Sequence, residues 1–358
     1  MVENMNNKLV FTRYLYNKDE VELSLLECIL KNKPFSETYY WITELYDSND
    51  PDDVWQFIYK VYYDFYYINY PQIINKINSY YKKWKKNKKI KYILYIIYNL
   101  GRAHKNINHD IFLYRTYYSS VLTYITSYID IHPYKGDNIY EKLLSFSFEN
   151  KNNEYISYYL KKNMKNKHIT KFLEENFSIT LDCNDHYKNK FHLLLCKCLI
   201  IPKIESKFIF KKVPISCYID VRSILKEVVK NTRTTLREKR LFEISKNIGC
   251  FKLARSNFVL DQEYWYNWEY HAYNSKIWKD RFDKYKIKID PTKKQLDFED
   301  DDEMEDFYSQ YGYEPDEQPK NVQEKSTKYI SSNSIDEWIQ SLSSRIIKTY
   351  KIEKKLEY

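Results

Sequence analysis

Length, composition and charge exclude several classes of protein at the outset. The chain has 358 residues, 43% of them hydrophobic and 30% charged, and a formal net charge of +9, so it can bury a substantial core and form about two domains. Only four residues are Gly, and neither glycine-rich phosphate-binding loop, GxGxxG or GxxxxGK followed by Ser or Thr, occurs. The GxSxG, HExxH and zinc-deaminase HxE motifs are also absent, so we expect a protein that is not an enzyme and uses no cofactor.

Residue usage indicates where the protein works. Its six Cys residues are spread thinly along the chain, which is typical of a reducing intracellular compartment. The first residues, MVENMNNKLVFTRY, lack the basic start and apolar core of a signal peptide. The longest apolar run, Tyr92 to Leu100, is far shorter than the ~20 residues of a membrane-spanning helix. We therefore expect a soluble intracellular protein that is not secreted and does not enter a membrane.

A succession of helices is expected over the first 200 residues. The clearest is DPDDVWQFIYKVYYDFYYINY (50–70), in which Asp50 can cap the first turn and Pro51 suits the first helical position. Its apolar residues recur every three or four positions and define one face: Val54, Ile58, Val61, Phe65 and Ile68. Similar runs predict helices at 19–30, 37–46, 71–87, 90–100, 111–129 and 190–201. The predicted fold class is mainly α, either solenoid-like stacked helical hairpins or an irregular multi-helix array.

The stretch YYKKWKKNKKIKY (80–92) is the main candidate for binding nucleic acid. Four of its lysines are expected on one side of a helix, with Tyr81 and Trp84 available to stack on bases: Lys82, Lys85, Lys86 and Lys89. A second basic region, 203–255, adds the candidates Arg233, Arg237 and Arg240. The alternative is a solvated helix face in a chain rich in Lys, Tyr, Asn and Ile, the composition that an AT-rich gene encodes. No known RNA- or DNA-binding motif accompanies either region.

The stretch CNDHYKNKFHLLLCKC (183–198) contains the only grouping of metal-ligating residue types worth testing. The candidate ligands are Cys183, His186, His192 and Cys196. Their spacing matches no standard zinc finger, and Cys in an apolar run usually packs in a core. We therefore favour core packing and expect no bound metal.

The helical pattern of the sequence gives way to an extended pattern at about residue 201. KFIFKKVPISCYI (207–219) is expected to form a strand pair or an extended connection, and 220–249 a broken helix. The segment 261–282 is a candidate helix rich in Tyr and Trp, whose rings could form a stacking platform but more often close a core.

Beyond Pro291 the chain becomes acidic. Residues 298–318, FEDDDEMEDFYSQYGYEPDEQ, contain no Lys or Arg, and no frame of them supplies the Gly of an EF-hand calcium loop. We predict a disordered acidic linker over 291–333, followed by an amphipathic helix in 334–358 that begins with a Ser334–Glu337 capping box. The linker either contacts a partner or folds back on the chain's own basic regions. The candidate contact residues are Phe298, Phe307, Tyr308, Tyr311, Tyr313, Trp338, Ile339 and Leu342.

Several phrases resemble an uncharacterised protein family of nucleocytoplasmic large DNA viruses. They are FTRYLYNKDEVELSLLECIL, ETYYWITELYDS, FIYKVYYDFYYINYP, WEYHAYNSKIWKDRF and FYSQYGYEPDEQ. The resemblance extends over most of residues 11–318 and leaves out the final helix. The resemblance implies a viral protein of the host cytoplasm, in the viral factory, or of the virion. It implies no catalytic or binding residue.

The sequence thus predicts four segments: an N-terminal helical domain (1–200), a basic, mainly helical region (201–290), the acidic linker (291–333) and the C-terminal helix (334–358). The leading functional hypothesis is a non-enzymatic interaction or scaffold protein that engages a protein partner through the linker and the last helix. The alternative is a nucleic-acid-binding protein that uses the Lys and Arg regions with their interleaved aromatic residues.

Overall fold

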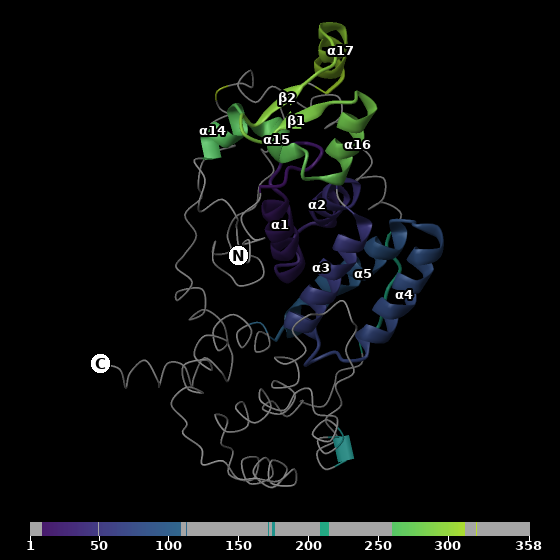
Figure 1. The fold of residues 1–358 in the computed structure, drawn as a ribbon. Coiled ribbons are helices and arrows are strands. Elements are labelled where there is room, and N and C mark those ends of the chain that lie inside the picture. The colour runs from purple at the N-terminus through teal and green to yellow at the C-terminus, as the bar shows by residue number, and fades with distance from the viewer. Residues whose placement is uncertain are drawn as a thin grey trace, which may run out of the picture. The chain divides into compact units, whose positions relative to one another are not determined.

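The computed structural model describes residues 9–48, 50–108, 112, 171, 174–175, 208–214, 260–311 and 320 (Figure 1). These residues are mainly helical, as the sequence predicts. Contacts divide the chain into two compact units, each assembled from separate stretches. Unit 1 comprises Met1–Phe57, Tyr80–His104 and Phe210–Trp338, and unit 2 comprises Ile58–Ser79, Lys105–Ile209 and Ile339–Tyr358.

The N-terminal part of unit 1 is built on a helical hairpin. Helices α1 (Lys18–Leu30) and α2 (Phe35–Ser48) are joined by a short turn and pack against each other and against α5 (Lys91–Arg102) (Figure 1). Helix α1 is buried on nearly every side, because apolar residues occupy most of its positions rather than a single stripe. The following helix, α3 (Pro51–Val61), begins as predicted, since the Asp50 carboxylate accepts a hydrogen bond from the Asp52 amide at 2.9 Å.

The apolar face predicted for residues 50–70 is confirmed. All five of its residues are buried, with 7% exposure or less: Val54, Ile58, Val61, Phe65 and Ile68. The helix does not stay regular, because a π-helical turn, η1 (Tyr62–Tyr66), follows α3. Within unit 2 the Tyr62 hydroxyl of this turn donates to the Pro71 carbonyl at 2.9 Å, and the Tyr59 hydroxyl of α3 donates to Asn78 at 2.8 Å. The buried Tyr66 hydroxyl has no hydrogen-bond partner among the described residues.

Residues 260–311, here called the C-terminal module, form the other described part of unit 1. They contain helices α14 (Leu260–Trp265), α15 (Trp268–Ala272) and α16 (Lys276–Lys284), and then a two-stranded antiparallel sheet. In this sheet β1 (Lys288–Asp290) pairs with β2 (Gln295–Asp297), with Ile289 opposite Leu296. Helix α17 (Asp301–Tyr311) follows the hairpin (Figure 1). The single helix expected over 261–282 is therefore three short helices.

The aromatic residues of this module form a core, which is the interpretation that the sequence favoured. Tyr264 and Trp278 are fully buried and Trp268 nearly so. The exception is Tyr266, which is 71% exposed in the turn between α14 and α15.

The C-terminal module packs against the first residues of the chain. The indole Nε1 of Trp278 donates to the Thr12 carbonyl at 2.8 Å, and the ring of Phe11 meets that of Tyr264 edge-on at 5.8 Å. Helix α16 also contacts α2. The predicted boundary at residue 201 therefore separates segments that belong to one compact unit, because these aromatic contacts join residues more than 250 positions apart.

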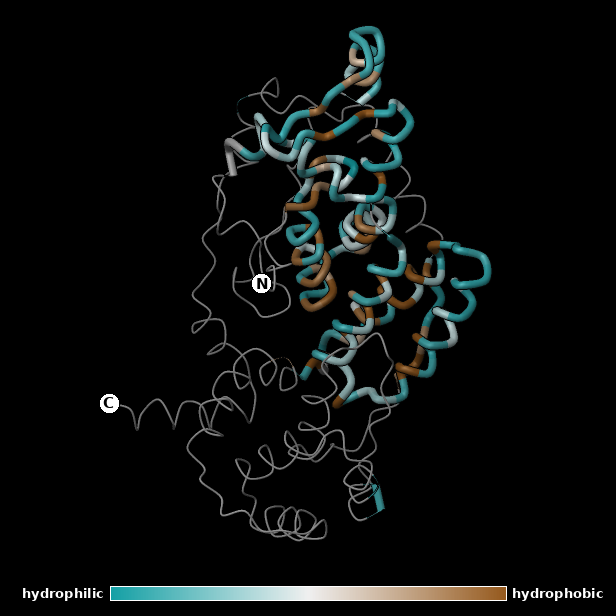
Figure 2. The backbone as a smooth tube through the Cα atoms, viewed as in Figure 1, coloured by the Kyte–Doolittle hydropathy of each residue, from teal (hydrophilic) through white to brown (hydrophobic). Residues whose placement is uncertain are grey.

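The prediction of a disordered acidic linker is wrong for residues 291–311, which form β2 and α17. The physical reason is Phe307, whose exposure is 0% and whose ring lies 5.5 Å from those of Phe282 and Tyr285. Acidic composition hid this one anchoring side chain, because most residues of α17 are hydrophilic (Figure 2) and Phe307 is the one residue that the helix buries. Apart from Lys320, residues 312–333 and the predicted helix in 334–358 lie outside the described residues.

Residues 208–214 belong to neither a helix nor a strand. Asn99 of α5 holds them, because its side-chain amide donates to the Lys211 carbonyl at 3.0 Å and its carbonyl accepts from the Lys211 amide at 2.9 Å. This fits the extended connection that the sequence offered as one alternative. Among the described helices, none combines the length and the apolar character needed to cross a membrane.

Candidate nucleic-acid interface

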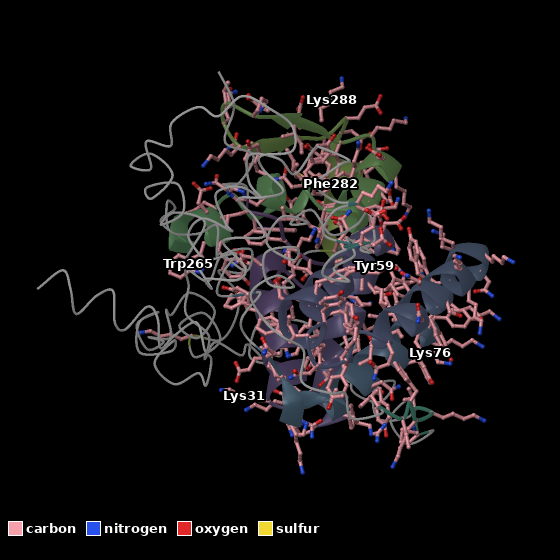
Figure 3. All side chains as sticks on the ribbon, turned by 90° about the horizontal axis from the view of Figure 1, so that it is seen from below. Lys31, Tyr59, Lys76, Trp265, Phe282 and Lys288 are labelled. Carbon is pink, nitrogen blue, oxygen red and sulfur yellow. The ribbon has the colours of Figure 1, made fainter. Side chains whose placement is uncertain are left out.

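Seven exposed lysines surround the junction of two helices in unit 1. They lie on the last turns of α4 (Ile73–Asn87), in the turn that follows and at the start of α5. We call this surface the lysine face, and its members are Lys82, Lys83, Lys85, Lys86, Lys88, Lys89 and Lys91. Blue-tipped side chains extend outward from the α4 and α5 ribbons in Figure 3.

The geometry of α4 explains why these lysines point outward. Successive residues of an α-helix are rotated by about 100°, so Lys82 and Lys86 lie about 160° around the helix from Trp84. Trp84 is fully buried. Its burial turns the opposite side of the helix, with its lysines, toward solvent.

Trp84 is held by three aromatic neighbours within unit 1. Its ring is stacked on that of Tyr81 at 6.0 Å and tilted against that of Trp55 at 5.8 Å. Its indole Nε1 donates to the Tyr46 hydroxyl at 3.3 Å, and the same hydroxyl donates to the Lys88 carbonyl at 2.7 Å. In this second bond the accepting carbonyl lies just beyond the end of α4, where Lys88 adopts the left-handed conformation (φ 52°) that commonly terminates a helix.

A second group of rings supports the α5 side of the lysine face. The rings of Tyr80 and Tyr95 are stacked at 4.4 Å, and the other neighbour of Tyr95 is Phe210, stacked at 5.9 Å. Burial raises the pKa of Tyr95 to about 12, so this phenol stays neutral at physiological pH. The two helices are thus joined by stacked rings beneath their lysines.

Several lysines lie over the aromatic rings rather than apart from them. The ammonium of Lys88 is 3.8 Å from the centroid of the Trp84 ring, and that of Lys83 is 5.0 Å from the Tyr80 ring. Lys85 lies over Tyr81 at 5.3 Å, and Lys91 lies over Tyr92 at 5.3 Å. Such cation–π contacts, together with the apolar stems of the side chains, hold the ammonium groups close to the surface.

No carboxylate accompanies these lysines in the sequence. Residues 65–109 contain neither Asp nor Glu. Among the residues that the structure describes, none of the seven lysines forms an ion pair. The contact with Tyr81 raises the pKa of Lys85 above its usual range, so this ammonium remains charged. The result is a concentration of positive charge without ion pairs among the described residues. Asp52 of α3, which accepts from the Tyr81 hydroxyl at 3.3 Å, acts on Lys85 through its negative charge.

The structure corrects the sequence prediction at two points. Trp84 was expected to be available for stacking on bases, but it is buried because it lies on the core side of α4. Lys89 was expected on the same helix face as Lys82, but α4 ends at Asn87 and Lys89 lies in the turn. The sequence prediction omitted Lys83, Lys88 and Lys91, which the absence of Asp and Glu over 65–109 could have indicated. The candidates Arg233, Arg237 and Arg240 lie outside the described residues.

The predicted protein-contact residues of the acidic segment are occupied within the chain. Phe307 is buried, Phe298 contacts it at 5.6 Å, and the Tyr308 hydroxyl donates to Glu269 at 3.1 Å. The guanidinium of Arg281 lies 4.6 Å from the Tyr311 ring. Residues 298–311 therefore pack on their own module, mainly through aromatic contacts. A contact with the chain's basic regions and a contact with a partner both stay predictions. The remaining candidates, Tyr313, Trp338, Ile339 and Leu342, lie outside the described residues.

A buried polar cluster ties the C-terminal module together. The Glu263 carboxylate bonds the His271 Nε2 and the Lys294 ammonium, each at 2.5 Å, and so joins α14 to α15 and to the turn of the hairpin. Burial lowers the pKa of His271 more than Glu263 raises it. The pKa of Glu263 is also lowered, because its bonds to Lys294 and His271 outweigh its desolvation. Because these bonds join three elements of the module, we interpret the cluster as a structural tie.

The candidate metal ligands fall in a part of the chain that the structure does not describe. Cys183, His186, His192 and Cys196 all lie outside the described residues. Among the residues that are described, no group of three or more His, Cys, Asp or Glu side chains is arranged to hold a metal ion.

Comparisons of the chain with protein-family models, with curated proteins and with solved structures gave no match. The functional argument therefore rests on the residues and their geometry.

Proposed function

We propose that this chain is a non-enzymatic nucleic-acid-binding protein that contacts phosphates through the lysine face. The observation that carries the proposal is the set of seven exposed lysines with no carboxylate in the surrounding sequence. Lysines neutralise backbone phosphates and release condensed counterions, which favours binding regardless of base sequence. The packed aromatic rings of α4 and α5 hold the two helices together, so the positive charges of their lysines form a fixed array.

The protein-partner hypothesis takes second place. Residues 298–311 of the acidic segment pack on the protein's own C-terminal module, and Phe307 is buried there, so a partner cannot reach Phe307. The C-terminal helix in 334–358 remains a prediction and would be the contact of a protein partner. Binding to nucleic acid and to a protein are compatible in one chain.

Three broader proposals accompany this function. We propose an irregular multi-helix array rather than a solenoid, because a π-helical turn and helices of five to fifteen residues do not suggest a regular repeat. The resemblance noted above supports a viral origin. With it we propose action in the host cytoplasm or in the virion.

A charge-reversal experiment tests the proposal. The variant Lys82→Glu/Lys85→Glu/Lys86→Glu/Lys89→Glu is compared with the unchanged chain by fluorescence anisotropy, using a labelled mixed-sequence 20-base-pair DNA at low salt. We expect binding to weaken by at least about 100-fold, because four phosphate contacts become four repulsions. In the unchanged chain, affinity should fall steeply as salt is raised.

The chain offers a matched control. Four exposed lysines of the C-terminal module, Lys276, Lys279, Lys288 and Lys293, are changed to Glu in a second variant with the same net charge. We expect this variant to retain most of its affinity, since these lysines have acidic neighbours. Equal loss in both variants would show that net charge alone is responsible and would contradict the proposal. Binding to anionic lipid vesicles but not to DNA would assign the lysine face to a membrane surface instead.

A further inference from the structure

We infer that the lysine face binds the backbone of double-stranded nucleic acid and does not stack on the bases of a single strand. The inference rests on the proposed function and specifies its ligand. It follows from how the aromatic rings of this face are used within unit 1.

Base stacking requires an aromatic ring with an accessible face. The Trp84 ring has Tyr81 stacked on it, Trp55 tilted against it and the Lys88 ammonium 3.8 Å from its centroid. With zero exposure, it cannot meet a base. The Trp84 ring, the largest in this region, is therefore part of the core and not of the surface.

The partly exposed rings are also engaged. Tyr95 is stacked between Tyr80 and Phe210, and Tyr80 has the Lys83 ammonium over its ring as well. The Tyr92 ring is approached by Lys91 at 5.3 Å, and its hydroxyl accepts from Asn87 at 3.3 Å. A base could reach these rings only by displacing an ammonium group or another ring. For Tyr80 and Tyr92 the group over the ring is an ammonium, and for Tyr95 it is another ring.

The lysines themselves project over a wide sector of α4. Lys83 lies about 100° from Trp84 on one side of the helix and Lys85 about 100° on the other, with Lys82 and Lys86 between them. Together with the lysines of the turn they form an exposed, charged surface. Such a surface binds phosphates through their charge. A duplex carries one charge per about 1.7 Å of its axis, which is twice the charge density of either of its strands.

The proposal predicts a preference that can be measured. Binding is compared by anisotropy at equal salt for three labelled probes: a mixed-sequence 20-base-pair DNA duplex, one of its strands, and oligo-dT of the same length. We expect the duplex to bind at least about fivefold more tightly than either single strand, because charge density is the property recognised. Two duplexes of unrelated sequence should bind within about twofold of each other.

A ring variant separates backbone contact from stacking. Tyr92→Leu removes a partly exposed ring of the lysine face and keeps all seven lysines. We expect its affinity for the single strand and for the duplex to change by less than about twofold, with helix content checked by circular dichroism. Tighter binding of oligo-dT than of the duplex, with loss of oligo-dT binding in Tyr92→Leu, would overturn the inference while leaving the proposed function intact.

Failure of the proposed function has a different outcome. In that case no probe binds with salt dependence, or the lysine-face variant and its matched control bind alike. The two results cannot be confused, because the inference concerns the ratio between probes and the proposed function concerns the loss on charge reversal.

Discussion

The lysine face and the C-terminal module use the same number of basic residues in opposite ways. Residues 80–104 and residues 260–311 each contain eight Lys and Arg, but the first stretch has no Asp or Glu and the second has fourteen. In the module, Lys286 pairs with Glu299, and Lys294 pairs with Glu263. In the described residues the lysine face has no such pairs. Positive charge is thus paired within the fold in one region and left without ion pairs in the other, as far as the described residues show.

Both regions nevertheless depend on buried aromatic residues. Trp84 anchors α4 beneath its lysines, and Phe307 anchors α17 beneath its carboxylates. In each helix a single large ring is buried while the charged residues face solvent. What differs is whether neighbouring elements supply opposite charges.

The largest effect is expected from removing either anchor. Phe307→Ala should lower the free energy of unfolding by about 3–5 kcal/mol, because the Phe282 and Tyr285 rings lose their contact and a cavity remains. Hydrogen exchange should show the loss concentrated in α17. Duplex DNA binding should stay within about twofold, since the lysine face is unchanged; a parallel loss of binding would contradict the separation of the two regions.

Trp84→Ala should have a similar cost, about 3–5 kcal/mol, measured by urea denaturation. Here binding should fall together with stability, because the rings that support the lysines lose their centre. Trp84→Phe, which keeps a ring, serves as the control and should recover most of the binding. Unchanged binding in a folded Trp84→Ala variant would show that the lysines need no aromatic support.

A smaller effect is expected from acidification, and only in the C-terminal module. The pKa of His271 is lowered in the fold from its usual 6.5, because burial disfavours the charged ring. The stability that neutral His271 contributes is therefore fully present above pH 6.5 and is lost as the pH falls through the lower folded pKa. Urea midpoints measured between pH 7.5 and 5 should decrease on acidification.

The groups facing His271 define the control for this pH effect. Glu263 raises its pKa and Lys294 lowers it, while Phe11 and Tyr270 present aromatic rings. His271→Asn should flatten the pH dependence across this range. Midpoints that rise on acidification of the unchanged chain would show that the ion pair with Glu263 outweighs burial.

The smallest effect is expected from single exposed lysines. Lys286→Gln removes a solvent-exposed pair with Glu299, 3.3 Å apart, and should lower stability only marginally. Lys86→Gln should leave stability unchanged or raise it slightly, because it relieves repulsion among like charges. Thermal denaturation at low and high salt should show the difference shrinking as salt screens both effects. A larger loss in Lys86→Gln would mean that this lysine has a partner.

Local patterns predicted the elements well where burial follows a helical period. The capping by Asp50 and the apolar face from Val54 to Ile68 are confirmed, because both depend on residues a few positions apart. The position of Trp84 was also within reach of the sequence, since the same helical period places it opposite Lys82 and Lys86. Residue type, rather than geometry, suggested that it would stack on bases.

The acidic segment shows what local patterns could not predict. Its composition indicates disorder, and nothing near Phe307 in the sequence reveals that Phe282 and Tyr285 will receive it. The discontinuous unit 1 has the same origin, because Trp278 finds the Thr12 carbonyl 266 positions away. Contacts of this kind depend on how the helices pack.

The sequence by itself determined the helical class, the absence of the glycine-rich phosphate loops and the accumulation of lysine without carboxylate over residues 65–109. These are properties of composition and of short-range spacing, which a chain carries before it folds. Only the tertiary structure decided which charges are paired and which rings are covered. Pairing and burial depend on neighbours from distant parts of the chain, and for that reason the same two kinds of residue, lysine and aromatic, form an exposed cationic surface around Trp84 and a closed module around Phe307.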